Sequence, residues 1–240
     1  KNVNVIFCDN KRCPHGMYHS LYGSYDTSRV IRSQIVWNEN SRNVIWQKII
    51  YAKILGQSAV LAYNDREEAS EKLQSYLPQI EIGDASNREG HAAKVYFNAL
   101  FGKDFSRERN QDSSFTNAAL NYGYSILMST VAREVTVNGY LTQIGIFHNN
   151  VFNEFNLASD VMEPFRPFVD QIVIHLKETE LNHDTKMKIV SFLNKKVIID
   201  RREQYFTNAL SIYVKSVLDA VTDCNPTIIK FPEYDMSIYE

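Results

Sequence analysis

The sequence predicts a mainly helical protein that opens with the remnant of a small N-terminal β domain. Glycine and proline are scarce, with 9 and 6 among 240 residues, and this favours long regular elements over a loop-rich scaffold. From residue 27 onward, apolar side chains recur at the spacing of helices. Before that point Val3, Val5 and Phe7 alternate as in a strand, and Pro14 and Gly16 mark turns. We therefore expect two parts, residues 1–24 and residues 25–240.

Start and stop signals bound the elements of the second part. Asp84 or Ser86 is expected to cap a helix that runs to Leu100 and stops at Gly102. Further helices are expected over residues 27–37, 41–55, 67–76, 117–137, 157–180, 184–196 and 203–221. Between and after them the sequence predicts a charged loop over 103–113, a short extended stretch over 139–147 and an irregular tail over 225–240.

Composition indicates a globular protein of a reducing compartment. Hydrophobic residues make up 44% and charged residues 22%, so the chain can bury a large core. Three cysteines make no disulfide framework, and the sequence shows neither a signal peptide nor a membrane-spanning apolar run, which indicates the cytoplasm. The formal charge of −2 means that any contact with DNA needs local basic patches or a partner. The chain begins at Lys1 directly in a strand pattern, so we expect that an N-terminal portion precedes it.

Three separated segments carry side chains that bind metals. They contain Glu89, then His148, then Asp160 and Glu163. Carboxylates together with one imidazole form a mixed oxygen and nitrogen shell, which suits Mg²⁺ or Mn²⁺. These ions suit chemistry on phosphates, because open coordination positions hold a phosphate oxygen and activate an attacking or leaving oxygen. The segments therefore indicate a single site for one hard divalent cation.

Glu89 also has an ordinary structural explanation. It continues the apolar stripe of Ala92 and Tyr96 along one helix face, and a buried carboxylate needs a cation or strong donors. That partner is either a metal or a basic side chain, for which Arg133 and Arg166 are the candidates.

The other positions are equally open when each is taken alone. His148 ends an apolar run before a turn, where it either faces a cleft or packs as a structural histidine. Asp160 and Glu163 share one face if they lie in a helix, and they then repel each other unless a positive charge lies between them. A helix that starts only at Pro164 weakens this argument and leaves an ordinary acidic turn.

Other candidate sites are weaker. Zinc prefers thiols and imidazoles like those of Cys8, Cys13, His15 and His19, but their spacing is more compact than in zinc fingers. The pair at 183–184, His-Asp, is similar to the metal dyad of helical phosphohydrolases but lacks the further His and Asp, so we interpret it as a surface turn with an Asp cap.

Basic residues near the Glu89 helix offer phosphate contacts. Arg107 and Arg109 lie in the loop that follows this helix and are candidates to hold phosphates. The sequence contains no phosphate-cradling glycine-rich loop, no Ser/His/Asp order and no catalytic-cysteine signature.

Four blocks of sequence occur in a fixed order, at residues 87–97, 117–127, 144–148 and 160–170. In this order they closely resemble the CRISPR-associated spacer-integration endonuclease, the large integrase subunit of the CRISPR adaptation complex, in its version from type II systems. The opening Val5-Ile-Phe-Cys-Asp and the Tyr22-Gly-Ser segment resemble the end of that family's β domain and its linker. The likeness covers nearly the whole chain.

The resemblance implies the roles of several residues. By this resemblance, residues 25–240 correspond to the family's helical catalytic domain. Glu89, His148 and Glu163 match the family's metal-binding and catalytic positions. Asp160 matches a further acidic position whose direct ligation varies among members. Tyr122 falls where some members place an aromatic residue near the site.

The resemblance also implies an activity and partners. Members of the family form homodimers, and two of these flank a dimer of a small ferredoxin-like adaptation subunit. The assembly binds double-stranded DNA with 3′ single-stranded ends, and each 3′-hydroxyl attacks a backbone phosphate at a border of the CRISPR repeat DNA. Members also show metal-dependent nuclease activity, and no membrane is involved.

Two other functions stay open on the residues alone. The first is a helical metal-dependent nuclease or phosphohydrolase without integrase activity, since the same ligands serve it equally well. The second is a DNA-binding scaffold without catalytic activity, in which the acidic and histidine positions are structural.

Overall fold

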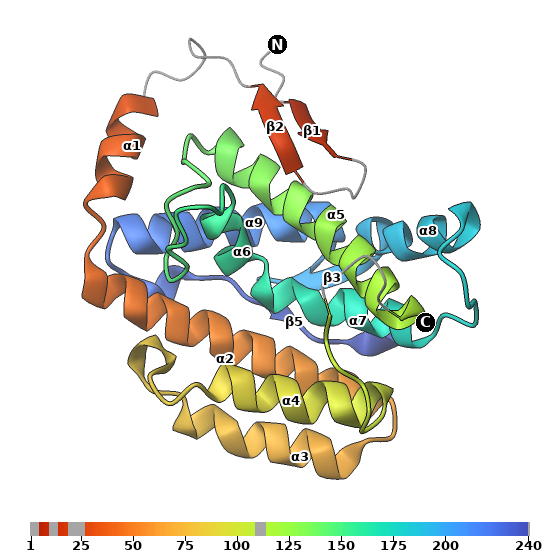
Figure 1. The fold of residues 1–240 in the computed structure, drawn as a ribbon. Coiled ribbons are helices and arrows are strands. Elements are labelled where there is room, and N and C mark those ends of the chain that lie inside the picture. Colours follow the sequence, from red (N-terminus) through yellow and green to blue (C-terminus); the bar gives the residue numbers. More distant parts are fainter. Residues whose placement is uncertain (1–4, 10–13, 19–26, 109–113, 240) are drawn as a thin grey trace.

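A layered assembly of helices with two small sheets makes up the computed structural model, which describes residues 5–9, 14–18, 27–108 and 114–239 (Figure 1). The mainly helical fold class is confirmed. At the N-terminus, β1 (Val5–Cys8) pairs antiparallel with β2 (Pro14–Tyr18), and Cys8 Sγ lies 3.4 Å from Ser129 Oγ of a long helix. The expected boundary at residues 24 and 25, with the Tyr22-Gly-Ser segment, Cys13 and His19, lies outside the described residues.

The helices follow the predicted order. Their bounds are α1 (Thr27–Ile35), α2 (Glu39–Tyr63), α3 (Glu67–Tyr76), α4 (Arg88–Phe101), α5 (Phe115–Val137), α6 (Asn156–Val161), α7 (Arg166–Ile174), α8 (His183–Val190) and α9 (Phe206–Thr222). Helix α2 starts earlier than expected because Asn38 is its cap and accepts a hydrogen bond from the Ser41 amide at 2.9 Å. Of the helices in the described part of the chain, none combines the length and the apolar character needed to cross a lipid bilayer.

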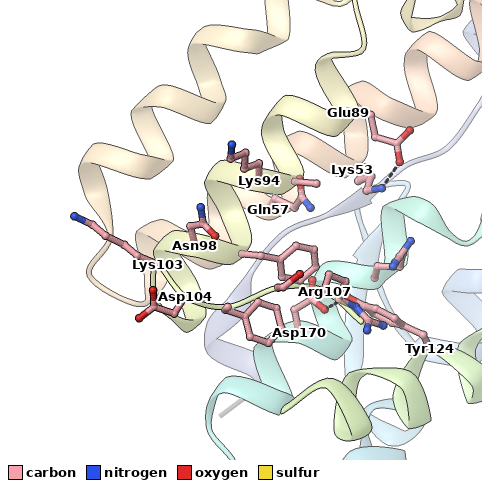
Figure 2. Close-up of a pocket in the computed structure, with 15 residues that line it drawn as sticks. Lys53, Gln57, Glu89, Lys94, Asn98, Lys103, Asp104, Arg107, Tyr124 and Asp170 are labelled. Atoms are coloured by element: carbon pink, nitrogen blue, oxygen red, sulfur yellow. Dashed lines mark hydrogen bonds and ion pairs between the residues drawn. The ribbon is translucent and has the colours of Figure 1, made fainter. Parts of the chain in front are cut away.

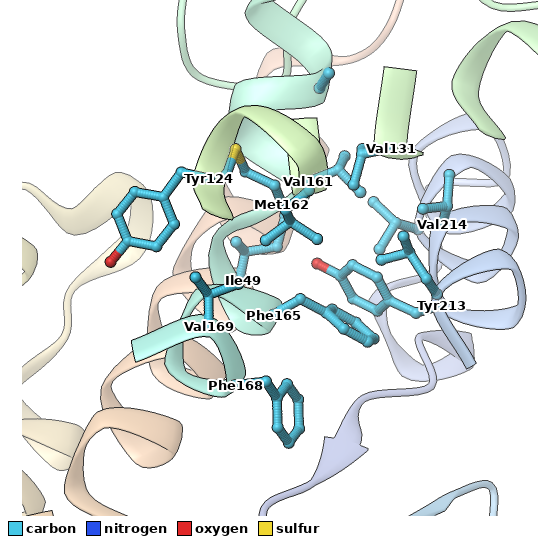
Figure 3. Close-up of a cluster of buried hydrophobic side chains, with 14 of the residues drawn as sticks. Ile49, Tyr124, Val131, Val161, Met162, Phe165, Phe168, Val169, Tyr213 and Val214 are labelled. Atoms are coloured by element: carbon cyan, nitrogen blue, oxygen red, sulfur yellow. The ribbon is translucent and has the colours of Figure 1, made fainter. Parts of the chain in front are cut away.

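The core lies where α2, α5, α7 and α9 meet. Figure 3 shows Phe165 between these helices, and its ring lies 5.2 Å from the rings of both Phe206 and Tyr213. Such contacts between aromatic rings add to the free energy gained from burial. Helices α5 and α7 also approach closely at Gly123, where a Cβ would overlap the Val169 side chain. This rigid centre supports the segments that carry the polar residues described below.

A second sheet corrects the prediction for residues 184–205. Its strands β3 (Lys196–Ile199), β4 (Arg202–Tyr205) and β5 (Pro232–Glu233) pair in the order β4-β3-β5. Asp200 and Arg201 have φ values of 54° and 61°, so they form a tight turn without the glycine that normally marks one. The predicted helices over 184–196 and 203–221 are therefore shorter, and the tail adds one short strand to the irregular segment expected there.

The helix predicted over 157–180 is interrupted. Helix α6 ends at Val161, the 3₁₀ turn η3 (Glu163–Phe165) follows, and α7 begins only at Arg166. Pro164 lies in the first turn of η3, because a proline has no amide hydrogen to donate within a continuing helix. Asp160 and Glu163 are therefore held in different local structures, both at the buried centre of the molecule.

Candidate functional site

The start of α4 fixes the position of Glu89. The Asp84 carboxylate accepts hydrogen bonds from the amides of Arg88 at 2.8 Å and Glu89 at 3.0 Å, while Asn87 is the cap residue itself and accepts from Gly90 at 3.3 Å. Of the two expected caps, Asp84 thus serves the first turn and Ser86 does not. A carboxylate in the first turn also interacts favourably with the helix dipole.

A lysine links the two glutamates of the site. Lys53 projects from α2 and is only 5% exposed, and its Nζ lies 2.6 Å from Glu89 Oε1. The same Nζ forms an ion pair with Glu163 Oε2. Glu89 and Glu163 come from separate helices, so one ammonium group holds together carboxylates that are 74 positions apart in sequence.

The partner of Glu89 therefore differs from those considered in the sequence. Arg133 pairs with its neighbour Glu134 on α5, and Arg166 pairs with Glu163 rather than with Glu89. The missed signal was a lysine inside the apolar pattern of α2, where Ile49, Ile50 and Ile54 are fully buried.

Glu163 is buried and meets a basic side chain on each of its oxygens. Its Oε1 accepts a hydrogen bond from Arg166 Nη1 at 2.8 Å, and its buried Oε2 faces the Lys53 ammonium in an ion pair. Burial opposes ionisation of this carboxyl, but the charges of Arg166 and Lys53 outweigh burial and lower its pKa to about 2. Glu163 is thus ionised at neutral pH, and each of its oxygens faces a cation.

Asp160 organises the loop that carries His148. Its Oδ2 accepts hydrogen bonds from the amides of Ile146 at 2.6 Å and Phe147 at 2.9 Å, and its Oδ1 accepts one from the His148 amide at 3.1 Å. The stretch over 139–147, predicted to be extended, is accordingly a series of turns, because a buried carboxylate replaces a neighbouring strand as the partner of these amides. Gly145 is required here, since a Cβ would overlap the His148 carbonyl oxygen.

The imidazole of His148 is oriented by the same carboxylate. Its Nδ1 lies 2.5 Å from Asp160 Oδ1, so Nδ1 and not Nε2 faces this carboxylate. The hydrogen bond to Asp160 raises the pKa of His148, against the effect of partial burial, and the charges of Asp160, Glu163 and Glu89 add to the increase. The three predicted ligands therefore act on one another electrostatically.

The loop that carries His148 also packs against an aromatic side chain of α2. The ring of Phe147 stacks on that of Trp46 from α2, with ring centroids 4.5 Å apart and planes inclined by 3°. The His148 ring meets the edge of the same indole at 5.8 Å.

A cleft of about 560 Å³ opens beside Lys53 and Glu89 (Figure 2). Its charged lining is mostly basic, with Lys53, Lys94, Lys103, Arg107 and Arg166 against Glu89, Asp104 and Asp170. Arg107 is fixed in the wall because it donates hydrogen bonds to Asn117 Oδ1 at 3.0 Å and Asn121 Oδ1 at 2.6 Å. The predicted partner of Arg107 in phosphate binding, Arg109, lies outside the described residues.

The aromatic residues that line the cleft are Phe97, Phe105 and Tyr124, and Tyr122 is not among them. Tyr124 lines the cleft and stacks under Arg166, whose Cζ lies 4.2 Å from the ring centroid. Tyr122 is not part of the lining, and its ring faces Lys186 of α8. Two positions along a helix differ by about 200° around its axis, so these tyrosines project to opposite sides.

Asp170 is a buried acid at the floor of the cleft. It accepts hydrogen bonds from Tyr96 at 2.9 Å and from Tyr124, and burial raises its pKa from 3.8 to about 6, although these donors and Arg166 oppose the shift. The folded protein thus holds this proton more tightly than the unfolded chain does. The proton's contribution to stability is complete below the unfolded pKa and is lost as the pH rises through about 6.

Replacing Asp170 by Asn is expected to remove that pH dependence, because a neutral amide can still bond both tyrosines. Relative to the variant, the wild type should lose about 3 kcal/mol of unfolding free energy between about pH 4 and pH 7. Urea unfolding at stepped pH measures this difference. Asp219→Asn, at an exposed ion pair with Lys215, is the matched control and should show almost none of it.

The structure thus brings Glu89 and Glu163 onto one cation and places His148 within their electrostatic reach. Among the described residues, no three His, Cys, Asp or Glu side chains already stand in a metal-binding arrangement. The two glutamates instead share the ammonium of Lys53. His183, part of the weaker candidate dyad, begins α8, whose cap is Asn182 rather than Asp184.

Comparisons with known proteins agree with this description. Residues 1–197 match the family described as CRISPR associated protein Cas1. A CRISPR-associated endonuclease Cas1 from Neisseria meningitidis serogroup C (strain 8013) is 35% identical over 236 residues, which cover 96% of this chain and 77% of that protein.

Two solved structures share the fold. One is a casposase bound to integration product, with a TM-score of 0.74 and 23% identity over 92% of this chain and 72% of that one. The other belongs to a partial Cas6-RT-Cas1–Cas2 complex, with a TM-score of 0.71 and 18% identity over 95% of this chain and 80% of that one. With a family match over most of its length and a relative identical at about a third of positions, the chain belongs to the CRISPR associated protein Cas1 family.

Proposed function

We propose that this chain is a metal-dependent DNA integrase and endonuclease that inserts short DNA with single-stranded 3′ ends into CRISPR repeat DNA. The observation that carries the proposal is the convergence of Glu89 and Glu163 on one cation, within electrostatic reach of His148 and next to a basic cleft. The names of the relatives support it, since one is an endonuclease and another was captured with an integration product.

The residues of the site fit a hard divalent cation. Glu163 Oε2 is a buried anionic oxygen in an ion pair with Lys53, and Glu89 is 27% exposed at the edge of the cleft. With Nε2 of His148 they offer the oxygen and nitrogen donors that Mg²⁺ or Mn²⁺ accepts. We assign Asp160 a positioning role instead of ligation, because both of its oxygens are occupied by the His148 loop.

Such an ion, when bound, would stabilise the charge that builds on the attacked phosphate and lower the pKa of the attacking hydroxyl. The side chains around it hold the DNA. Arg166 and Arg107 present fixed guanidinium groups to phosphate oxygens, and Lys94 and Lys103 extend the basic wall. Binding through the backbone is weakly dependent on sequence and falls with salt.

The reaction is an in-line transesterification. The 3′-hydroxyl oxygen of the short DNA attacks a phosphorus at the repeat border and gives up its proton to water. The bond from that phosphorus to the 3′ oxygen of the preceding nucleotide breaks, and this oxygen takes up a proton to become a new 3′-hydroxyl. One phosphodiester bond replaces another, so no external energy source is consumed. With water as the attacking group, the same site acts as an endonuclease.

Partners follow from the charge of the chain and from its relatives. With a formal charge of −2, one subunit holds DNA weakly, so tight binding requires several basic patches acting together. A homodimer assembled on a small ferredoxin-like adaptation subunit supplies them, and a structural relative occurs in a complex with Cas2.

Replacing Glu89 by Gln is expected to lower strand transfer by at least about 100-fold, because a neutral amide is a poor ligand for a hard cation. The assay supplies DNA with 3′ overhangs, a repeat-containing plasmid, the small adaptation subunit and Mn²⁺, with EDTA as the metal-free arm. Glu203→Gln is the matched control, because Lys196 lies 2.6 Å from Glu203 in an exposed pair of the same length.

The products separate the possible functions. Joined molecules that depend on Mn²⁺ and on Glu89 support integration, and cleavage without joining would instead identify a plain nuclease. Tight DNA binding without either product would identify a scaffold.

A further inference from the structure

Lys53 occupies an unusual place for a lysine. Its side chain is 7% exposed and ends between two carboxylates that come from α4 and from η3. Lysine is almost never buried to this degree without a partner, and here it has two. Ionic contact on both sides means that this ammonium sets the separation of Glu89 and Glu163.

The two cations at Glu163 differ in how firmly they are held. Arg166 donates a directed hydrogen bond to Oε1 at 2.8 Å and is stacked on Tyr124 at 4.2 Å. Lys53 reaches Oε2 through a flexible four-carbon stem and divides its charge between Glu163 and Glu89. An arriving cation therefore competes with Lys53 and leaves Arg166 in place.

The charges balance in the present state. Glu89 and Glu163 supply two negative charges, and Lys53 and Arg166 supply two positive ones. A divalent ion added to this group would meet the repulsion of Lys53, so that the ion and the ammonium exclude each other. Lys53 lines the cleft together with Gln57, one helical turn further along α2, and the open cleft is where a displaced ammonium can go.

We propose that Lys53 is a positioning residue that holds Glu89 and Glu163 together before a divalent ion binds, and that it turns into the cleft toward a DNA phosphate when the ion displaces it. This inference rests on the proposed function. It makes Lys53 a competitor for the ion in the absence of DNA. A phosphate in the cleft relieves the competition, so DNA and metal strengthen each other's binding.

The test compares Lys53→Met with the wild type in the full chain, using Mn²⁺ as the probe. Methionine fills the same space without charge, so Mn²⁺ should bind at least about tenfold more tightly by calorimetry. Added Mn²⁺ should also raise the melting temperature of this variant more than that of the wild type. Strand transfer at saturating Mn²⁺ should fall, because the phosphate loses its ammonium. Lys72→Met, at an exposed position of α3, is the control.

A second variant covers the case in which Lys53→Met does not fold. Lys53→Arg keeps the charge, and its planar fork can bond both carboxylates, so Mn²⁺ should bind more weakly than to the wild type. Equal Mn²⁺ affinity in the wild type and the folded variants would overturn the role of Lys53 and leave metal-dependent catalysis standing. Absence of Mn²⁺ binding in all of them would overturn both proposals.

Discussion

Replacing Glu163 by Ala is expected to abolish strand transfer and to lower the free energy of unfolding by about 3–5 kcal/mol. Glu163 is 4% exposed and faces Lys53 on one oxygen and Arg166 on the other. Its removal leaves the buried Lys53 and the partly buried Arg166 without their shared anion, and it also removes a proposed metal ligand. Chemical denaturation measures the first effect, and the joining of labelled DNA to a repeat-containing plasmid measures the second.

Glu163→Gln separates the two consequences. The amide has nearly the same shape and keeps one acceptor for Arg166, so most of the fold's stability should return while strand transfer stays low. Duplex binding, measured by fluorescence anisotropy with the small adaptation subunit present, should remain close to that of the wild type. A Glu163→Ala protein that still joins DNA at an appreciable rate would refute the assignment of this residue.

Replacing Asp160 by Ala is the second change with a large expected effect. The amides of Ile146, Phe147 and His148 would lose their acceptor inside the protein, at about 1–3 kcal/mol for each buried donor left unsatisfied. The loop should open, the orientation of the His148 ring should be lost, and strand transfer should fall by about 10–100-fold or more. Hydrogen exchange of residues 145–148 reports the loop directly, and the DNA-joining assay reports the reaction.

The matched control is Asp200→Asn, since Asp200 lies in the exposed β3–β4 turn and pairs only at the surface with Lys230. It should change stability by less than about 1 kcal/mol. Asp160→Ala with unchanged exchange rates over residues 145–148 would show that the backbone hydrogen bonds do not hold the loop.

Local signals in the sequence predicted much of the helical framework. Helix α3 spans Glu67–Tyr76 as expected, because acidic residues open it and Pro78 lies just past its end. The end of α4 at Gly102 was equally predictable, since the residue there has a φ of 105°, which glycine adopts readily and other residues rarely do. These helix boundaries depend on residues that are neighbours in the sequence, so the sequence alone predicts them.

The features that the sequence did not predict depend on distant contacts. The 139–147 stretch has the apolar pattern of a strand, yet side chains of Gln34 and Asp160 take the place of a neighbouring strand. Lys53 is 36 positions from Glu89, so no local spacing connects the two. The β3–β4 turn places Asp200 and Arg201 at positive φ without a glycine, so its composition did not indicate a hairpin turn.

Because Trp46 contacts the His148 loop, it is an intrinsic fluorescence probe of the site. The sequence has two tryptophans, and the other one, Trp37, packs against Tyr140 at a ring distance of 5.7 Å. Indole emission responds to the charge and the mobility of its immediate neighbours. A change in the charge of the His148 imidazole or in the position of the Phe147 ring is therefore expected to change the fluorescence of Trp46. In a Trp37→Phe protein this fluorescence can be followed in real time without an attached label.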